Sequence, residues 1–367
     1  MPKNKNLCTA KLVKNDEFYT LMDDVDAEMS AYLRFDPDVF CAKTVLCPCD
    51  DPERSNFAKY FRTHFAELGL KRLICTCYVK EQSSAQLSLF DAQPADTPDD
   101  CAHHGKLMVM DAPDKIHYGA LTGNGDFRSA EVTALRDQAD MLITNVPFSL
   151  ANDAVSWALA SGKHFAFIIS MNAVTNINIF PRIQAGDIWL GATKPKRFLT
   201  PSGAIQTLGN VCWITNIDHG ARHEPLALNT MAHNLARNEP LKRVLREKYG
   251  QAPEHLHYER YINYDALEVP FLGAIPSDYA GVMGVPLSIL ERLNPAQFEV
   301  IGSGSSDAPE ALGIQPMGDA WLRAYRAHGG TGNYTSGMRC LAIITEDGRG
   351  IAVYKRILVR NKHPIAQ

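Results

Sequence analysis

The residues with the most definite chemistry stand at positions 145–148, where Asn145, Val146, Pro147 and Phe148 follow an apolar run. The Asn145 side-chain oxygen and the Val146 backbone carbonyl are adjacent acceptors. Together they could hold an exocyclic amine and pull its nitrogen toward tetrahedral geometry, which a weakly nucleophilic conjugated amine needs before it attacks a sulfonium methyl group. Pro147 stiffens the turn, and Phe148 offers a face on which an extruded base could stack. Taken alone, the four residues also describe a strand that ends in an ordinary turn.

These residues need a scaffold, and the apolar pattern predicts one. Short apolar runs alternate with stretches of helical periodicity, which is typical of an α/β sheet with helices on both faces. We expect strands at 44–49, 72–79, 106–110, 140–144, 164–170 and 211–216, and helices at 56–68 and 151–160. In open α/β sheets, ligands bind beyond the carboxyl ends of the strands, so residues that follow these strands should share one edge.

A second group of polar residues follows the first expected strand. The turn and the helix start after it contain Asp50, Asp51, Pro52, Ser55, Asn56 and Phe57. A ligand ammonium would pair with a carboxylate at this place, and a ligand carboxylate would bind the free amides of the helix N-terminus. The Gly-rich fingerprint common in such turns is absent, and a simple helix cap by Asp or Ser explains the residues equally well.

A third group lies in the segment 123–129, Gly-Asn-Gly-Asp-Phe-Arg-Ser. Asp126 could accept the amine of an adenine ring, and Phe127 could cover that ring. A Gly-rich turn with a capping Asp is the alternative, and the heptapeptide alone favours it. The order of the groups at successive strand ends favours a shared site.

Composition limits the class of protein. The chain has 367 residues, 46% of them hydrophobic and 21% charged, with a net charge of -4. No apolar run reaches the roughly 20 residues that span a bilayer, and the first residues lack the apolar core of a secretion signal. We therefore expect a cytoplasmic protein with reduced cysteines. The pairs Cys47/Cys49 and Cys75/Cys77 are too closely spaced for the usual zinc site, so we expect buried thiols and no metal.

The chain resembles the adenine-specific DNA methyltransferases of the EcoRI type. The resemblance rests on the groups above and on further segments along the whole chain, at residues 15–20, 49–61, 68–74, 125–129, 189–191, 212–216, 278–286, 294–299 and 354–362. It implies a Rossmann-like methyltransferase fold, S-adenosylmethionine as donor, and methylation of adenine N6 in double-stranded DNA after base flipping. It also implies that Phe18, Tyr19 and Thr20 close over the methionine end of the donor.

Two departures from the family pattern matter. Val146 stands where the family has Pro, but it keeps its carbonyl, and Pro147 after it restricts its backbone to extended angles. We therefore expect activity. Cys77 and Tyr78 stand where an acidic residue often binds the donor's ribose, so the ribose partner stays unassigned. The alternatives are a catalytically impaired DNA-binding module of the same fold, or an amino-methyltransferase that acts on cytosine N4 or on RNA.

The resemblance also suggests how the chain is divided. We expect a catalytic core at 1–190 with a flexible polar insertion at 81–104. A target-recognition region at 191–270 would include the core strand at 211–216, and the segment 271–367 would pack on the core and add to DNA binding. Basic charge predicts DNA contact at Lys194, Lys196 and Arg197. For the basic segment 242–248, a solvated helix face is the favoured explanation.

A short motif inside the insertion suggests a protein partner. Its residues Gln86, Leu87, Leu89 and Phe90 place an amide before an aliphatic-aromatic pair. The arrangement looks like the pentapeptide that bacterial replication proteins insert into the sliding clamp, and a loop that folds back on its own domain is the alternative. We expect a monomer or weak dimer of bacterial, plasmid or phage origin.

Overall fold

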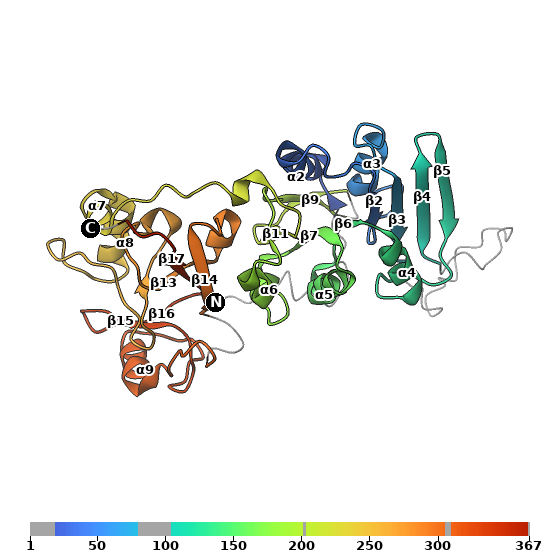
Figure 1. Cartoon of the computed structure of the whole chain (residues 1–367). Coiled ribbons are helices and arrows are strands. Elements are labelled where there is room, and N and C mark those ends of the chain that lie inside the picture. Colours follow the sequence, from blue (N-terminus) through green and yellow to red (C-terminus); the bar gives the residue numbers. More distant parts are fainter. Residues whose placement is uncertain (1–18, 80–103, 201–202, 305–309, 366–367) are drawn as a thin grey trace, which may run out of the picture. The chain divides into compact units, whose positions relative to one another are not determined.

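The computed structural model of the protein describes residues 19–79, 104–200, 203–304 and 310–365. The chain forms two compact units (Figure 1). Unit 1 consists of Met1–Val174 and Ile188–Gly220, and unit 2 of Thr175–Asp187 and Ala221–Gln367. Within the described ranges, no helix has both the length and the apolar character that a membrane span requires.

Unit 1 contains an eight-stranded sheet in the order β5-β4-β3-β2-β6-β7-β11-β8. In chain order its strands are β2 (Thr44–Cys47), β3 (Arg72–Cys77), β4 (Lys106–Ala112), β5 (Lys115–Ala120), β6 (Met141–Asn145), β7 (His164–Ser170), β8 (Trp189–Leu190) and β11 (Val211–Thr215). Strands β3, β2, β6 and β7 run parallel, whereas β4 is antiparallel to β3 and β11 is antiparallel to β7.

The order of the parallel strands reverses between β2 and β6. From β2 the chain moves to β3 on one side, and it later returns at β6 on the other side of β2 before it continues to β7. Such a switch point opens a crevice beyond the carboxyl ends of the two central strands, where open α/β sheets bind ligands. The residues directly after β2 and β6 are therefore the first candidates for a ligand site.

Helices cover both faces of this sheet, which confirms the predicted fold class (Figure 1). On one face lie α2 (Met22–Phe35) and α3 (Asn56–Thr63), and on the other lie α4 (Ala130–Gln138) and α5 (Ala151–Ser161). The α3 helix begins where the Ser55 hydroxyl accepts from the Phe57 amide. Its rings Phe57, Tyr60 and Phe61 are buried in a core that also contains Val25 and Met29 of α2.

A second, small sheet of unit 1 has the order β1-β9-β10. It is formed by β1 (Tyr19–Thr20), β9 (Arg197–Leu199) and β10 (Ile205–Thr207), all antiparallel. Thr20 lies opposite Phe198, which is fully buried in the same core as α3. The small sheet thereby fixes the segment before α2 to the segment that follows β8.

The predicted strands at 44–49, 72–79, 106–110, 140–144, 164–170 and 211–216 correspond to β2, β3, β4, β6, β7 and β11. The helix expected at 56–68 is regular only to Thr63, after which turns continue to Gly69. The thiols of Cys47 and Cys75 are buried neighbours across β2 and β3, as expected, whereas Cys49 and Cys77 are partly exposed, because they lie at and beyond the ends of these strands. The sequence analysis missed α2 and the antiparallel strand β5.

Unit 2 contains the four-stranded sheet β12-β13-β17-β14 and the hairpin β15-β16. Its elements are α6 (Phe180–Ala185), α7 (Met231–Arg237), α8 (Glu239–Glu247), β12 (Leu267–Glu268), β13 (Met283–Pro286), β14 (Phe298–Ser303), α9 (Gly318–Ala327), β15 (Ala342–Ile344), β16 (Gly350–Ala352) and β17 (Arg356–Asn361). Trp321 of α9 is fully buried and packs on the hairpin, which it joins by a hydrogen bond to the Ile343 carbonyl.

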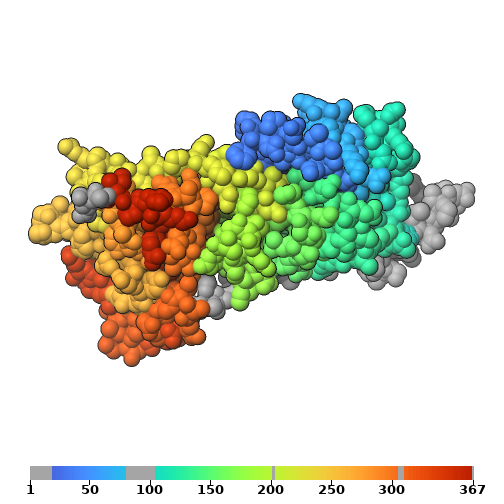
Figure 2. Space-filling model, viewed as in Figure 1, coloured from blue at the N-terminus to red at the C-terminus, as the bar shows by residue number. Residues whose placement is uncertain are grey.

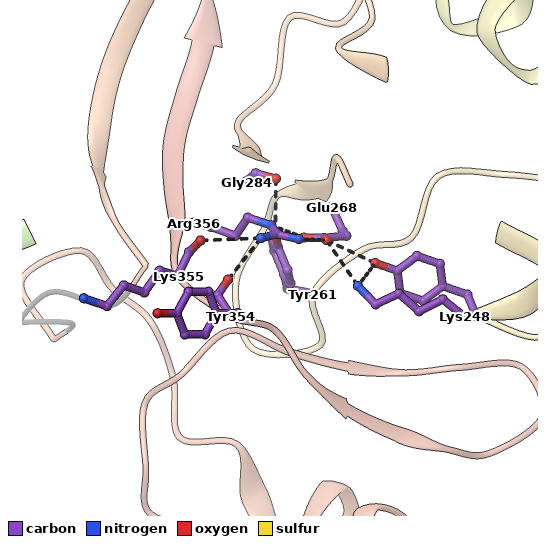
Figure 3. A network of polar contacts seen from close by, with 8 residues as sticks. Lys248, Tyr261, Glu268, Gly284, Tyr354, Lys355 and Arg356 are labelled. Atoms are coloured by element: carbon purple, nitrogen blue, oxygen red, sulfur yellow. Dashed lines mark hydrogen bonds and ion pairs between the residues drawn. The ribbon is translucent and has the colours of Figure 1, made fainter. Parts of the chain in front are cut away.

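A buried ion pair lies in the four-stranded sheet of unit 2 (Figure 3). Glu268 accepts from the Arg356 guanidinium at 3.0 and 2.5 Å, and also from the hydroxyls of Tyr249 and Tyr261. Arg356, one of the basic residues near the C-terminus, thus neutralises an internal carboxylate. Lys242 of the basic segment 242–248 similarly pairs with Glu239 at 2.8 Å.

Candidate active site

Asp50 and Asn145 stand at the two sides of the switch point. Asp50 follows β2, and its backbone amide donates to the Thr76 carbonyl of β3 at 2.9 Å. Its carboxylate accepts from the Thr144 hydroxyl and from the Ser55 hydroxyl, each at 2.5 Å. Because Thr144 directly precedes Asn145 at the end of β6, one hydrogen bond joins the acidic turn to the strand that carries the Asn-Val-Pro-Phe segment.

The Asp50 carboxylate is held in an unfavourable place for a negative charge. The residue is 5% exposed, and burial raises its pKa to about 7, against the hydrogen bonds from Ser55 and Thr144 and with a further contribution from Asp51. A cation beside this carboxylate would restore the charged form. The site therefore suits a ligand with a positive group, such as an ammonium.

Asp51 has the opposite electrostatic setting. Burial raises its pKa, but the Glu53 amide, the Lys106 ammonium and the Arg54 amide donate to its carboxylate and lower the pKa below its usual value. The Lys106 nitrogen, at the start of β4, lies 3.0 Å from one carboxylate oxygen. Asp51 therefore stays ionised and shapes the turn between β2 and α3.

Three of the predicted segments around the switch point, together with Phe198 of β9, form a closed series of contacts. The Phe148 ring packs edge-on against Phe198 of β9, with ring centroids 6.3 Å apart. Phe198 pairs with Thr20 of β1, whose carbonyl accepts from the Asn56 side chain at 2.8 Å. Asn56 follows Ser55, which donates to Asp50, and Asp50 returns to Thr144. Thr20, Asp50, Asn56 and Phe148 thus belong to one local assembly.

Asp126 is tied to the end of the neighbouring strand β3. The Val79 amide donates to the Asn124 carbonyl at 2.8 Å, and Gly125 adopts a φ of 83° against the Cys77 carbonyl. A Cβ atom at Gly125 would lie 2.4 Å from that oxygen, so the close approach requires glycine. Asp126 is therefore at the same carboxyl edge as Asp50, two strand ends from Asn145.

Both carboxylate oxygens of Asp126 are engaged. Arg128 donates from Nε at 3.0 Å to one oxygen and from Nη2 at 2.7 Å to the other, and this pairing lowers the pKa of Asp126. Arg128 also reaches Asp153 at 3.1 Å. Oδ1 also accepts from the Arg128 amide, so a ligand amine at Asp126 would bind Oδ2, which Arg128 engages only once.

Several predicted site residues have buried side chains. Phe57 is 1% exposed and packs edge-on against Trp213 at 5.7 Å, and Phe127 is 4% exposed and packs against Trp157 at 5.4 Å. The sequence analysis placed Phe127 over the adenine of the donor and Phe57 in the donor turn, and in the structure each of these rings has a core partner. Val146 is also buried, and Pro52 lies buried in the acidic turn. Phe18 and the motif at 86–90 lie outside the described residues.

Two residues that matter here were not predicted. Thr144 was treated only as the end of an apolar run, although its hydroxyl bonds Asp50. Lys106 was treated as the start of a strand, although its ammonium reaches Asp51 from a position 55 residues later in the chain. Neither contact has a local sequence signal, because both partners come from distant segments.

The basic segment 194–197 leads from β8 into β9. The side chains of Lys194, Lys196 and Arg197 are exposed, while Pro195 between them is buried. The Arg197 guanidinium lies 3.8 Å from Asp23, a distant pairing that leaves more than half of its side chain exposed. The three charges are therefore accessible to a polyanion.

A mixed α/β sheet with an acidic turn on one side of its switch point and Asn-Val-Pro-Phe on the other is the arrangement expected of a methyltransferase that acts on an amine. The donor residues present fit S-adenosylmethionine, because carboxylates and the N-terminus of α3 meet where an amino acid end would bind.

Comparison with known proteins identifies the family. The model of the family described as adenine-specific methyltransferase EcoRI matches residues 6–362, so the chain belongs to this family. The protein is thus an adenine-specific DNA methyltransferase with S-adenosylmethionine as its methyl donor.

Similar proteins cover most of the chain. The Type II methyltransferase M.EcoRI of Escherichia coli is 34% identical over 319 residues, which are 81% of this chain and 89% of that protein. The Type II methyltransferase M.MpnI of Mycoplasma pneumoniae is 30% identical over 361 residues, 93% of this chain and 98% of that protein. M.MgeORF184P of Mycoplasma genitalium is 29% identical over 312 residues, 80% of this chain and 84% of that protein. No solved structure shows significant similarity.

Proposed function

We propose that the chain methylates N6 of an adenine that is extruded from duplex DNA into the crevice between the ends of β2 and β6. The observation that carries this proposal is the Thr144–Asp50 hydrogen bond, since it couples the donor turn to the strand end that bears Asn145. An amine held at 145–148 would then lie beside the donor's amino acid end. Extrusion is required because N6 of a stacked and paired adenine is out of reach inside a duplex.

The chain's own residues would act on both reactants. The Asn145 side-chain oxygen and the Val146 carbonyl would accept the two amine hydrogens and direct the nitrogen lone pair toward the methyl carbon. Phe148 would stack on the base from a position that Phe198 supports. The N–C bond forms as the carbon–sulfur bond breaks, and the nitrogen then loses a proton. Bound S-adenosylmethionine supplies a methyl group whose leaving group is a neutral thioether.

The donor end of the site would bind by charge. Asp50 and Asp51 would face the donor's ammonium, and the amides at the start of α3 would face its carboxylate. Asp126 would accept the adenine amine of the donor at Oδ2, which Arg128 engages through a single hydrogen bond. The contacts of Thr20 with Asn56 and Phe198 support a role of β1 in closing this end.

Transfer of a labelled methyl group tests the proposal directly. The wild-type chain should label duplex DNA, and nucleoside digestion should give N6-methyladenine rather than N4-methylcytosine. Asn145→Ala should lower the rate at least about a hundredfold, the scale found when one preorganised polar contact to a transition state is removed. Ser149→Ala, an exposed position beyond the tetrapeptide, is the matched control. Rapid methylation by Asn145→Ala would refute the role of this residue, and labelled RNA or cytosine would refute the target.

An impaired DNA-binding module is the second candidate, favoured by Val146. It predicts DNA affinity without turnover, and turnover that appears in Val146→Pro. Methylation by the wild-type chain would support the first candidate. We expect this result because Pro147 already restricts residue 146 to extended backbone angles.

The partner and setting are also proposals. The family and its bacterial members support work on DNA in a bacterial cytoplasm. For Gln86, Leu87, Leu89 and Phe90 the sequence is the support: an amide and two apolar anchors within a polar segment suit the groove of a sliding clamp. Purified clamp should bind the wild type and lose a Leu89→Ala/Phe90→Ala variant. Equal affinity would end the clamp proposal without affecting the enzymatic one.

A further inference from the structure

Helix α2 contains a carboxylate that is fully buried. Glu28 has no exposed surface, and α2 itself covers the outside of unit 1, where Figure 2 shows its residues in blue. The carboxylate accepts from the Ala192 amide at 2.9 Å, the Thr193 amide at 2.7 Å and the Thr193 hydroxyl at 2.5 Å. Burial raises the pKa of Glu28, and the hydrogen bonds from Thr193 and Ala192 act against this rise, so the carboxylate holds both residues in place.

The neighbouring glycine shows how closely the two segments approach. A Cβ atom at Gly191 would lie 2.2 Å from Glu28 Oε1 and 2.5 Å from the Trp213 side chain. Any larger residue would push the segment away from α2. The glycine therefore permits the contact, and Glu28 makes it.

A second carboxylate on the same face of α2 continues the contact. Asp24 lies one helical turn before Glu28, so the two side chains are neighbours on the helix surface. Asp24 accepts from the backbone amides of Lys196 and Arg197, which lower its pKa, although partial burial has the larger effect and leaves the pKa raised. Together, Asp24 and Glu28 bind the backbone of residues 192–197.

The consequence concerns the three basic side chains. α2 binds the backbone of this segment, and the side chains of Lys194, Lys196 and Arg197 are exposed, with Arg197 also 3.8 Å from Asp23 of α2. The segment then continues into β9, where Phe198 pairs with Thr20 and packs on Phe148. The backbone position that α2 fixes is thus also fixed relative to the Asn-Val-Pro-Phe segment.

We propose that Glu28 is a positioning residue for DNA, which anchors the backbone of residues 192–197 so that Lys194, Lys196 and Arg197 meet the phosphates near the extruded adenine. The inference rests on the proposed DNA contact of these three residues. Glu28 itself does not touch the DNA. A preorganised set of cations binds better than a mobile one, since less conformational entropy is lost on binding.

The direction in which Glu28→Gln changes DNA affinity distinguishes a positioning role from a purely electrostatic effect. Removing a negative charge from a protein near DNA should leave binding unchanged or strengthen it. Positioning predicts the reverse for Glu28→Gln, because glutamine keeps one oxygen and places an NH2 group where the second oxygen accepted from a donor. Asp26→Asn removes the same charge from an exposed position of the same helix and is the matched control.

The experiment measures anisotropy of a fluorescein-labelled duplex of mixed sequence over a range of salt concentrations. Glu28→Gln should weaken binding about tenfold and flatten the dependence of log K on log salt by about one unit, the loss of one phosphate contact. Asp26→Asn should bind as well as wild type or better. Binding of S-adenosylmethionine, followed by calorimetry, should not change in either variant, whereas a general loss of structure would lower it.

A triple variant, Lys194→Ala/Lys196→Ala/Arg197→Ala, distinguishes the two possible failures. It should flatten the salt dependence by about 2.7 units, and adding Glu28→Gln to it should cause no further loss, since residues that act through one another are not additive. Wild-type binding by the triple variant would refute the proposed DNA contact. Weak binding by the triple variant with normal binding and slope in Glu28→Gln would overturn the positioning role alone. Should Glu28→Gln not fold, Thr193→Val, which removes one donor, decides the same question.

Discussion

Replacing Asp50 by asparagine should stabilise the protein at alkaline pH while it weakens donor binding. Burial raises the pKa of Asp50 from 3.8 to about 7, so the folded state binds this proton more tightly than the unfolded state does. The contribution to stability is therefore present at low pH and is lost as the pH rises toward 7. Relative to a group that never ionises, the cost is about 2 kcal/mol at pH 5 and about 4 kcal/mol at pH 8.

An asparagine side chain at this position does not ionise and can still accept a hydrogen bond from a hydroxyl. The free energy of unfolding of Asp50→Asn relative to wild type should therefore increase by about 2–3 kcal/mol between pH 5 and pH 8. Urea unfolding followed by tryptophan fluorescence measures this, because three of the four tryptophans, Trp157, Trp189 and Trp213, belong to unit 1. Asp51→Asn is the control with the opposite sign. The lowered pKa of Asp51 means that its charged form stabilises the fold. Asp51→Asn should therefore lower the free energy of unfolding, by the same amount at pH 5 and at pH 8.

The Asp50→Asn variant should also bind S-adenosylmethionine at least about tenfold more weakly at pH 8, because the ammonium loses a buried ionic partner. Calorimetric titration measures this affinity, and ligand-dependent stabilisation gives an independent value. A difference in stability between Asp50→Asn and wild type that is the same at both pH values would refute the buried, raised-pKa description. Unchanged donor affinity would refute the pairing with the ammonium.

Three further predictions concern single contacts. Arg128→Gln should strengthen S-adenosylmethionine binding a few-fold, because Asp126 loses a competing partner. Calorimetric titration measures this affinity. Weaker binding by the variant would mean that Arg128 itself holds the donor. Gly125→Ala should lower stability by roughly 1–3 kcal/mol, since the residue has a positive φ, whereas Gly209→Ala, with open space around it, should change thermal unfolding little. Glu268→Gln should destabilise unit 2 by about 3–5 kcal/mol in urea unfolding, because a buried guanidinium loses its counter-charge; a neutral effect would show that the pair is dispensable.

The sheet of unit 1 could be predicted because its strands are continuous apolar runs. β2, with the sequence Thr-Val-Leu-Cys, is buried along its whole length, and β7 was predicted to the residue. The hairpin strand β5 was missed because five of its six residues are exposed, so no apolar pattern marks it. In unit 2, β12 has only two residues, and its Glu268 is buried by pairing rather than by hydrophobicity.

The site divides in the same way. Asp50 and Asn145 could be placed together because both follow buried strands, and parallel strands present their carboxyl ends at one edge. For the aromatic rings near the site, the sequence alone could not distinguish a role in donor binding from a place in the core. Phe57 stands in the turn-to-helix segment and also on the apolar face of α3, and only the packed structure shows that its ring contacts Trp213.

Contacts between distant segments explain what sequence patterns cannot supply here. Thr144 and Asp50 are 94 residues apart, and Glu28 and Thr193 are 165 apart, yet each pair is joined by a 2.5 Å hydrogen bond. In each case a buried carboxylate collects donors from another segment, because an unsatisfied charge in the core would be too costly. Asp50 thereby joins the acidic turn after β2 to the end of β6, and Glu28 joins α2 to the basic segment. The same physical requirement, satisfying a buried charge, would thus align donor, target and DNA within one unit.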